Sequence, residues 1–320
     1  MKRALLVGLN NYPEKENQLE CCVQDAKEMA RVLSVNEDGS KNFECTTLVS
    51  SGNLVRRVDL RNEITRLFEG EGDIALFFFS GHALLTANGG VLVTEDADPF
   101  DQGVGMNELL NPASASKFKE IVIVLDCCHS GALGNILGSA AETSALRKGV
   151  SFLTACSSEQ SSLEGEGIGI FTGPVIDALE GGASDVLGQV TIASVYGYVD
   201  EVLGAEDQRP LFKANVSRLT PLRQCAPQVA RDILRKLPRY FPQENYELPL
   251  DPSFEPTSEY TPRNRENERI FGELQKMRAV RLVEPHSSEE HMYYAAMNSK
   301  SCHLTPLGRF YRKLAIQGSI

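Results

Sequence analysis

The chain has 320 residues and a formal net charge of −11, with 42% apolar and 23% charged residues. Such a composition is typical of a globular protein long enough for a sizeable core and more than one domain. The charge is uneven: residues 221–320 carry 15 basic and 12 acidic side chains, whereas the rest of the chain carries 17 and 31. A strongly acidic first part argues against binding of a nucleic-acid backbone and leaves room for cationic substrates.

The amino terminus and the cysteines indicate a cytoplasmic protein. The first apolar run, "RALLVGL", ends at Leu9 and is too short for a signal-peptide core. No segment approaches the roughly 18 apolar residues that a membrane helix needs. The eight cysteines include two adjacent pairs, a spacing that is not typical of a disulfide framework. We therefore expect free thiols and no membrane association.

In chain order, buried strands alternate with amphipathic helices. Runs that are apolar throughout predict strands covered on both faces at residues 3–9, 73–79, 120–125 and 150–155. Apolar residues at three- and four-residue spacing predict helices at 19–33, 60–68, 171–181 and 191–203. This alternation predicts an α/β fold with a mostly parallel central sheet flanked by helices. In such folds, functional sites gather at the carboxyl ends of the strands.

From residue 221 onward, the alternation of buried strands and amphipathic helices ends. A short helix in "QVARDILRKLP" precedes a proline-rich stretch that predicts a linker or an extended wrap. The remainder predicts a helix, a hairpin formed by "RLVEP" and "MYYAAMN", and a last helix, which resembles part of a winged-helix module. We expect a first domain over 1–222, a helix and linker over 223–265, and a small α+β regulatory or interaction domain over 266–320.

Two strand ends carry the residues of greatest chemical interest. The run "DIALFFFSGH" ends at His82, and "EIVIVLDCCHSG" contains Asp126, Cys128 and His129. A cysteine nucleophile needs a base or a positive environment to form its thiolate. His129 is adjacent to Cys128, but consecutive side chains of a strand point to opposite faces, so His82 on a neighbouring strand is geometrically better. The alternative is structural, because buried cysteines and a histidine after a strand are more often packing residues.

The paired motifs resemble those of the caspase-like cysteine peptidases, and among these the metacaspases and their bacterial relatives. "FFFSGHA" is similar to the histidine motif and "VIVLDCCHSG" to the nucleophile motif, within a similarity over most of residues 1–220. The resemblance implies a caspase-like (caspase/haemoglobinase) fold and a cysteine endopeptidase with Cys128 as nucleophile and His82 as base. It further implies an oxyanion hole formed by the backbone N–H groups of Cys128 and Ala83. Ala83 stands where the family usually has glycine; if that position requires a positive φ, alanine is strained and the hole forms only after activation.

The same resemblance implies an acidic S1 pocket and cleavage after Arg or Lys. The matching positions are Asp126 and Asp25, with Cys22 and Ser80 beside them. A desolvated guanidinium needs a planar carboxylate partner, so two aspartates at the floor of a pocket suit a basic substrate residue. The alternative for Asp25 is an exposed helix position.

The chemistry requires no cofactor, although metacaspases often need calcium. The weak candidates for Ca²⁺ ligands are Asp96, Asp98 and Asp101, whose spacing lacks the glycine and glutamate of an EF-hand, so a solvated acidic loop is the alternative. A zinc site is not expected, because no CxxC or HxxxH partner is present. The Gly-, Ala- and Ser-rich segment 131–149 includes Arg147 and Lys148, which are candidate self-cleavage points or part of an ordinary exposed loop.

These observations favour a cysteine peptidase that acts on protein substrates with Arg or Lys at the cleavage site. The resemblance implies a regulated effector of a stress or antiphage defence pathway, controlled by an activating protein or ligand that engages the C-terminal domain. The rival hypothesis is a catalytically silent scaffold or adaptor that acts through that domain. Retention of His82, Cys128 and Asp126 argues against the scaffold, since a silent protein has no chemical need of all three.

Overall fold

The structure is a computed structural model that describes residues 1–87, 89–127, 148–155, 167–204, 210–259, 262–286, 288–289 and 291–320. By its internal contacts the chain divides into two compact units. The first comprises residues 1–184 and 189–226, and the second comprises residues 185–188 and 227–320. Among the described residues, no helix is both long and apolar enough to cross a membrane. The six cysteines in the described part of the chain are all free thiols.

The first unit is built on a central sheet, and the predicted α/β fold with a mostly parallel sheet is confirmed. Strands β1, β2, β3, β7 and β8 are parallel, and β10 joins β8 in the antiparallel direction. In spatial order the described strands are β10 (Leu211–Asn215), β8 (Val150–Thr154), β7 (Glu120–Cys127), β3 (Ile74–Gly81), β1 (Lys2–Gly8) and β2 (Phe43–Val49). Four of them, β1, β3, β7 and β8, coincide with the four apolar runs of the sequence, as expected for strands covered on both faces.

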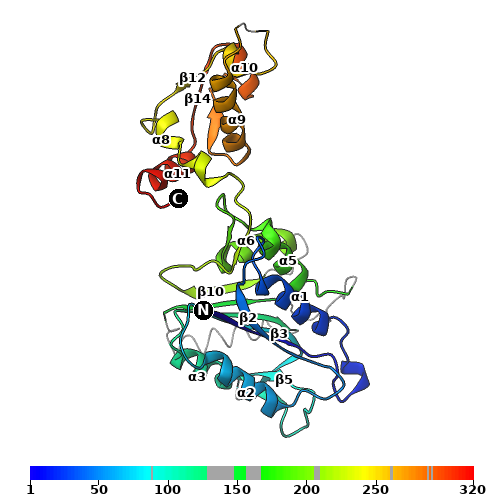
Figure 1. Ribbon diagram of the computed structural model, residues 1–320. Coiled ribbons are helices and arrows are strands. Elements are labelled where there is room, and N and C mark those ends of the chain that lie inside the picture. The colour runs from blue at the N-terminus through cyan, green and yellow to red at the C-terminus, as the bar shows by residue number, and fades with distance from the viewer. Residues whose placement is uncertain are drawn as a thin grey trace. The chain divides into compact units, whose positions relative to one another are not determined.

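Helices cover both faces of this sheet (Figure 1). Alternate residues of β3 enter different cores: Leu76 and Phe78 pack with residues of α1, α5 and α6, while Phe77 and Phe79 pack with residues of α2 and α3. All four side chains are buried, and burying each contributes roughly 1.5–3 kcal/mol. The helices of the first face are α1 (Cys22–Ser34), α5 (Thr172–Asp177), its π-helical continuation η2 (Ala178–Gly182), and α6 (Ile192–Leu203). Those of the second are α2 (Arg57–Phe68) and α3 (Met106–Ala115).

Smaller elements complete the first unit at the loops. The strands β4 (Ala83–Thr86), β5 (Gly89–Val93) and β6 (Gly103–Gly105) form an antiparallel sheet directly after β3. A short 3₁₀ turn, η1 (Lys15–Asn17), lies between β1 and α1, and β9 (Gln189–Val190) pairs with β11 (Arg223–Gln224). The small sheet matters for the site, because its first strand begins immediately after His82.

The second unit is an α+β structure with its own core, in agreement with the predicted C-terminal α+β region. Its three-stranded antiparallel sheet has the order β12-β14-β13. Buried Phe241, Phe271, Leu274, Met277 and Leu304 form part of one apolar cluster. In chain order its elements are α7 (Arg231–Leu234), α8 (Leu237–Tyr240), β12 (Leu248–Pro249), η4 (Pro252–Phe254), α9 (Arg265–Ala279), β13 (Val283–Pro285), α10 (Met292–Met297), β14 (Ser301–Leu304) and α11 (Pro306–Ile316).

One predicted element of this unit is wrong. The segment "MYYAAMN", predicted as the second strand of a hairpin, forms the helix α10. Met292, Ala295 and Ala296 are buried, and their three- and four-residue spacing lies on one face of a helix. The partner of β13 is instead β14, in which Cys302 and Leu304 alternate with less buried residues. The helix–hairpin–helix order that suggested a winged-helix module is therefore interrupted by α10.

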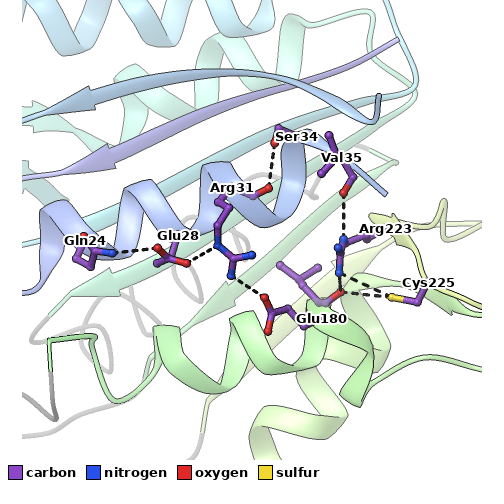
Figure 2. A network of polar contacts seen from close by, with 9 residues as sticks. Gln24, Glu28, Arg31, Ser34, Val35, Glu180, Arg223 and Cys225 are labelled. Carbon is purple, nitrogen blue, oxygen red and sulfur yellow. Dashed lines mark hydrogen bonds and ion pairs between the residues drawn. The ribbon is translucent and has the colours of Figure 1, made fainter. Parts of the chain in front are cut away.

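Within the first unit, a network of polar contacts joins α1 to the segment around η2 (Figure 2). The Arg223 guanidinium donates from Nε to the carbonyl of Val35 (3.1 Å) and from Nη1 to the carbonyl of Leu179 (2.9 Å). Arg31 of α1 pairs with Glu28 and with Glu180, each at 2.6 Å, but in an exposed position. Arg223 therefore links the C-terminal end of α1 to η2 by hydrogen bonds. Arg31 adds an exposed ion pair between α1 and η2.

These two arginines form a matched pair for a stability test. Arg223→Met removes a buried donor from two carbonyl groups, and hydrogen bonds that involve a charged group contribute about 1.5–3 kcal/mol each. We expect the free energy of unfolding to fall by about 3–6 kcal/mol in urea denaturation. Arg31→Met should change it by less than about 1 kcal/mol, as for other surface pairs. Equal effects of the two substitutions would contradict this assignment.

Candidate active site

The carboxyl ends of β3 and β7 lie side by side. The register of this parallel pair aligns Ser80 with Asp126 and Gly81 with Cys127, where the pairing ends. The next residues in the chain are His82 and Cys128. Cys128 and His129 lie outside the described residues, so the structure describes the strand that leads to Cys128 but not this residue. Cys127 is buried in the core on the α2 and α3 face, consistent with a packing residue.

His82 is held by the loop that follows β1. The Nε2 atom of its ring lies 2.8 Å from the carbonyl oxygen of Asn17. Tyr12 receives a hydrogen bond from the His82 backbone N–H (2.8 Å), and its ring lies 4.6 Å from the imidazole, centre to centre. Because a carbonyl only accepts, Nε2 is the protonated nitrogen, which makes Nδ1 the basic nitrogen of the neutral ring. The ring is therefore fixed in one tautomer and in one orientation.

Glycine is required next to this histidine by close packing. A Cβ atom on Gly81 would lie 2.6 Å from the Tyr12 hydroxyl and 3.0 Å from the ring of Phe79. A real Cβ does not approach atoms so closely, so only glycine lets Tyr12 reach the backbone of His82.

Ala83 is not strained, which corrects one sequence-based expectation. Within the described chain, the non-glycine residues with positive φ are Arg281 and Ser299, so Ala83 is not among them. Ala83 begins β4 opposite Leu92, and the bond from the Val93 N–H to the His82 carbonyl (2.9 Å) flanks this pair. Such a flanking bond marks a non-hydrogen-bonded pair, in which the Ala83 N–H points away from β5. The sheet conformation suits alanine, and no rearrangement is needed to relieve strain.

The four residues predicted for S1 lie on three neighbouring elements. Asp25 and Cys22 belong to the first turns of α1, Ser80 to the end of β3, and Asp126 to the end of β7. Ser80 donates a hydrogen bond to Asp25 Oδ2 (2.8 Å), and the Gly169 backbone N–H donates to Asp25 Oδ1 (2.8 Å). Asp25 is 1% exposed, so the predicted alternative of an exposed helix position is wrong. Two donors and the amino end of α1 stabilise its negative charge.

Asp126 is the less buried of the two residues, although its carboxylate is enclosed by protein. Thr172 at the start of α5 donates to its Oδ2 (2.6 Å). Burial, and then the negative charge of Asp25, raise the pKa of Asp126 to about 7. A cation placed beside both carboxylates would reverse this shift, because it favours the ionised form. The two carboxylates are therefore suited to bind a positively charged group of another molecule.

The Cys22 thiol beside this pair is not a second nucleophile. Its pKa is raised well above the usual value by burial, while a hydrogen bond with Ser80 opposes the shift and the charges of Asp25 and Asp126 add to it. A thiol in this environment stays protonated and unreactive at neutral pH. Cys22 is thus a lining residue.

The aspartates considered for calcium have other partners. Asp96 Oδ1 accepts from the Arg57 backbone and from Thr94, and Asp101 pairs with the Arg57 guanidinium at 2.6 Å. Asp98 Oδ1 accepts the backbone N–H groups of Phe100 and Asp101. Among the described residues, no cluster of three or more His, Cys, Asp or Glu side chains has the arrangement of a metal site. As arranged, the three carboxylates do not fit a calcium ion.

Four residues near the predicted site were not found from the sequence. Tyr12 and Asn17 contact His82, while Gly169 and Thr172 contact the two aspartates. Asn17 and Gly169 act through backbone atoms, which leave no side-chain pattern to find. Of the candidate self-cleavage points, Lys148 is exposed and Arg147 lies outside the described residues.

The order of the strands, the covering helices and the paired strand ends define a caspase-like α/β fold. The profile of the caspase domain, Peptidase C14, matches residues 1–220, more than half of the chain. The chain therefore belongs to the caspase domain family and carries a caspase-family cysteine peptidase domain.

The individual proteins that match this chain share little sequence identity with it. Metacaspase-9 of Arabidopsis thaliana is 27% identical over 152 residues, which cover 41% of this chain and 43% of that protein. The match thus spans less than half the length of this curated relative. Among solved structures, the protein GSU0716 of Geobacter sulfurreducens matches with 18% identity and a TM-score of 0.49, over 71% of this chain and 97% of its own. Caspase-1 of Spodoptera frugiperda matches with 13% identity and a TM-score of 0.49, over 70% and 90%.

Proposed function

We propose that this protein is a cysteine endopeptidase that hydrolyses peptide bonds after Arg or Lys, with Cys128 as nucleophile and His82 as base. The observation that carries the proposal is the position of the Asp25–Asp126 pair at the strand ends that lead to His82 and Cys128. Membership of the caspase domain family supports the peptidase chemistry, and the acidic pair supports the basic specificity.

In the proposed reaction, His82 accepts the Cys128 thiol proton at Nδ1, and the thiolate attacks the carbonyl carbon of the substrate. The backbone N–H groups of Ala83 and Cys128 stabilise the oxyanion of the tetrahedral intermediate. Collapse of the intermediate breaks the C–N bond, and His82 returns its proton to the leaving amine. Water then hydrolyses the thioester, releases the carboxylic acid and restores the thiol. The Asn17 carbonyl supports this role, since it keeps the ring orientation through both proton transfers.

Substrate recognition is assigned to the two carboxylates in unequal roles. Asp126 is the less buried of the two residues and, in the described part of the chain, accepts a hydrogen bond from Thr172 at one oxygen, so it binds the guanidinium or ammonium group directly. Asp25 is buried with both oxygens hydrogen-bonded, so it acts mainly through its charge. Cys22 and Ser80 line the same region.

The direct test uses peptide electrophiles that differ only in the residue at the reactive end. An arginyl chloromethyl ketone should label Cys128 in the intact protein, and an aspartyl one should not. Cys128→Ala should remove the label, as identified by mass spectrometry. If Cys128 reacts with neither electrophile, with or without Ca²⁺, and no Arg-peptide dye is turned over, the catalytically silent scaffold is favoured instead.

Self-processing is a further expected activity. Incubation of the wild type should produce fragments that end at Arg147 or Lys148, because a peptidase of this specificity can cut its own exposed basic residues. The measurement is mass spectrometry of fragments from wild type and Cys128→Ala incubated under identical conditions. Fragments that persist in Cys128→Ala would remove self-processing from the account.

The family resemblance also supports a role as a regulated effector in a stress or antiphage defence pathway. In this proposal the second unit, with its separate apolar core, binds the activating protein or ligand. Deletion of residues 227–320 should then remove the response to the activator while leaving the Cys128–His82 pair in place.

A further inference from the structure

The segment that leads into α5 supplies a hydrogen-bond donor to each of the two carboxylates. The Gly169 N–H donates to Asp25 Oδ1 at 2.8 Å, and the Thr172 hydroxyl donates to Asp126 Oδ2 at 2.6 Å. The Thr172 side chain is fully buried, and the Gly169 carbonyl accepts the Gly173 N–H (2.8 Å), the first turn of the helix. The segment 169–172, which leads into α5, therefore holds each carboxylate by one hydrogen bond.

Gly169 lies so close to the carboxylates that it has no room for a side chain. A Cβ atom at this position would lie 2.8 Å from Asp126 Oδ2 and 3.0 Å from Asp25 Oδ2. A methyl group there would press on one oxygen of each aspartate and displace it. The absence of a side chain at position 169 therefore keeps both oxygens in their present positions.

We propose that Gly169 and Thr172 are specificity-determining residues that select a cationic side chain, guanidinium or ammonium, on the amino side of the cleaved bond. This inference rests on the proposed function. Two carboxylates brought together repel each other, and a donor to each one favours the ionised forms that a cation needs. Without a side chain, Gly169 leaves the carboxylate oxygens undisturbed, and Thr172 orients the Asp126 carboxylate toward the cation. Neither residue touches the reacting atoms.

A purely structural role for the segment predicts a different outcome. Damage to packing would lower the activity toward every substrate alike. A role in specificity changes the discrimination between a charged and a neutral side chain of the same shape. Matched dye substrates with arginine or citrulline before the scissile bond separate the two cases, because citrulline replaces the guanidinium by a neutral urea group.

The chain offers a matched control for the glycine. In Gly173→Ala, the added Cβ would meet its nearest neighbour, the Ile168 side chain, at an ordinary 3.9 Å. Gly169→Ala should raise KM for the arginine substrate, because the added methyl group displaces the carboxylate oxygens that recognise its charge. The arginine-to-citrulline ratio of kcat/KM should fall on the order of 10- to 100-fold, the range for weakening one hydrogen bond to a charged group. Gly173→Ala should leave the ratio at the wild-type value. The alkylation rate of Cys128 by iodoacetamide, a small reagent that does not need this pocket, should be unchanged in both variants.

The threonine provides a second route if Gly169→Ala fails to fold. Thr172→Val removes the hydroxyl donor and keeps a side chain of similar size, so it should lower the arginine-to-citrulline ratio of kcat/KM. Thr172→Ser keeps the hydroxyl and should have the wild-type ratio. An unchanged ratio in Gly169→Ala, or equal ratios in Thr172→Val and Thr172→Ser, would overturn the inference while leaving the proposed function intact. A wild type that prefers citrulline or cleaves neither substrate would contradict the proposed function itself, and the inference with it.

Discussion

We expect replacement of His82 by Asn to lower kcat for peptide hydrolysis by about 100- to 10,000-fold, the usual contribution of a general acid–base residue. The physical reason is the proposed role of His82 as base: with Nε2 bonded to the Asn17 carbonyl, Nδ1 is the nitrogen that accepts the Cys128 proton in the proposed reaction. An asparagine of similar size can keep a contact with the loop but cannot accept the Cys128 proton. The measurement is kcat for an Arg-peptide dye, with the rate of Cys128 alkylation by iodoacetamide as a measure of thiolate formation. Both rates should fall in His82→Asn.

His129 provides the matched control for this experiment. It is the direct neighbour of Cys128 in the sequence, and it is the base that a reader of "DCCHSG" alone would choose. His129→Asn should keep kcat within a few-fold of the wild type, because consecutive side chains of the strand predicted from the sequence face opposite sides. A large loss in His129→Asn with a small loss in His82→Asn would overturn the assignment of the base.

Asp126→Asn should lower kcat/KM for an arginine substrate by about 100- to 1,000-fold, as expected when one partner of a desolvated charge pair is removed. For the matched citrulline substrate the same substitution should change kcat/KM only slightly, since no cation is involved. Asn keeps an oxygen for Thr172, so the fold around the pocket is preserved. If both substrates lose activity equally, Asp126 supports the structure and does not read the substrate charge.

The discrimination between arginine and citrulline should also depend on pH. In the free protein the pKa of Asp126 is raised to about 7 by burial and by Asp25, so its charge develops as the pH rises through that value. The arginine-to-citrulline ratio of kcat/KM should therefore rise from about pH 6 to about pH 8, while in Asp126→Asn it should stay flat. The ratio cancels the titration of Cys128 and His82, because both substrates depend on them equally. A flat ratio in the wild type would contradict this role of Asp126.

Much of the central sheet could be predicted, because a parallel strand covered on both faces leaves a continuous apolar run. β3 and β7 are the clearest cases, with Ile74–Gly81 and Glu120–Cys127 almost wholly buried. The small sheet β4-β5-β6 was not predicted, since its strands are short and partly exposed. α10 was misread as a strand because a six-residue segment rich in Tyr and Met fits either period, and only its packing decides.

At the candidate site, the sequence identifies functional side chains by their residue type, but it does not identify functional backbone groups. The family resemblance implied that Asp25, Ser80 and Asp126 share one pocket; Ser80 is bonded to Asp25 and aligned with Asp126, while their role in S1 stays a prediction. The Asn17 carbonyl and the Gly169 N–H could not be predicted, because any residue supplies the same groups and only the path of the chain places them. Strain at Ala83 was expected only if that position required a positive φ, and the described structure has none there, because the backbone angle follows from strand β4.

The most direct test of the central claim is the cleavage specificity of the intact protein on a peptide library with every residue represented at each position, read by mass spectrometry. The account predicts new carboxyl termini at Arg and Lys, with none in Cys128→Ala. Asp126→Asn should reduce these products selectively while Cys128 still reacts with iodoacetamide. Cleavage after Asp, or cleavage after basic residues that persists in Cys128→Ala, would contradict the account.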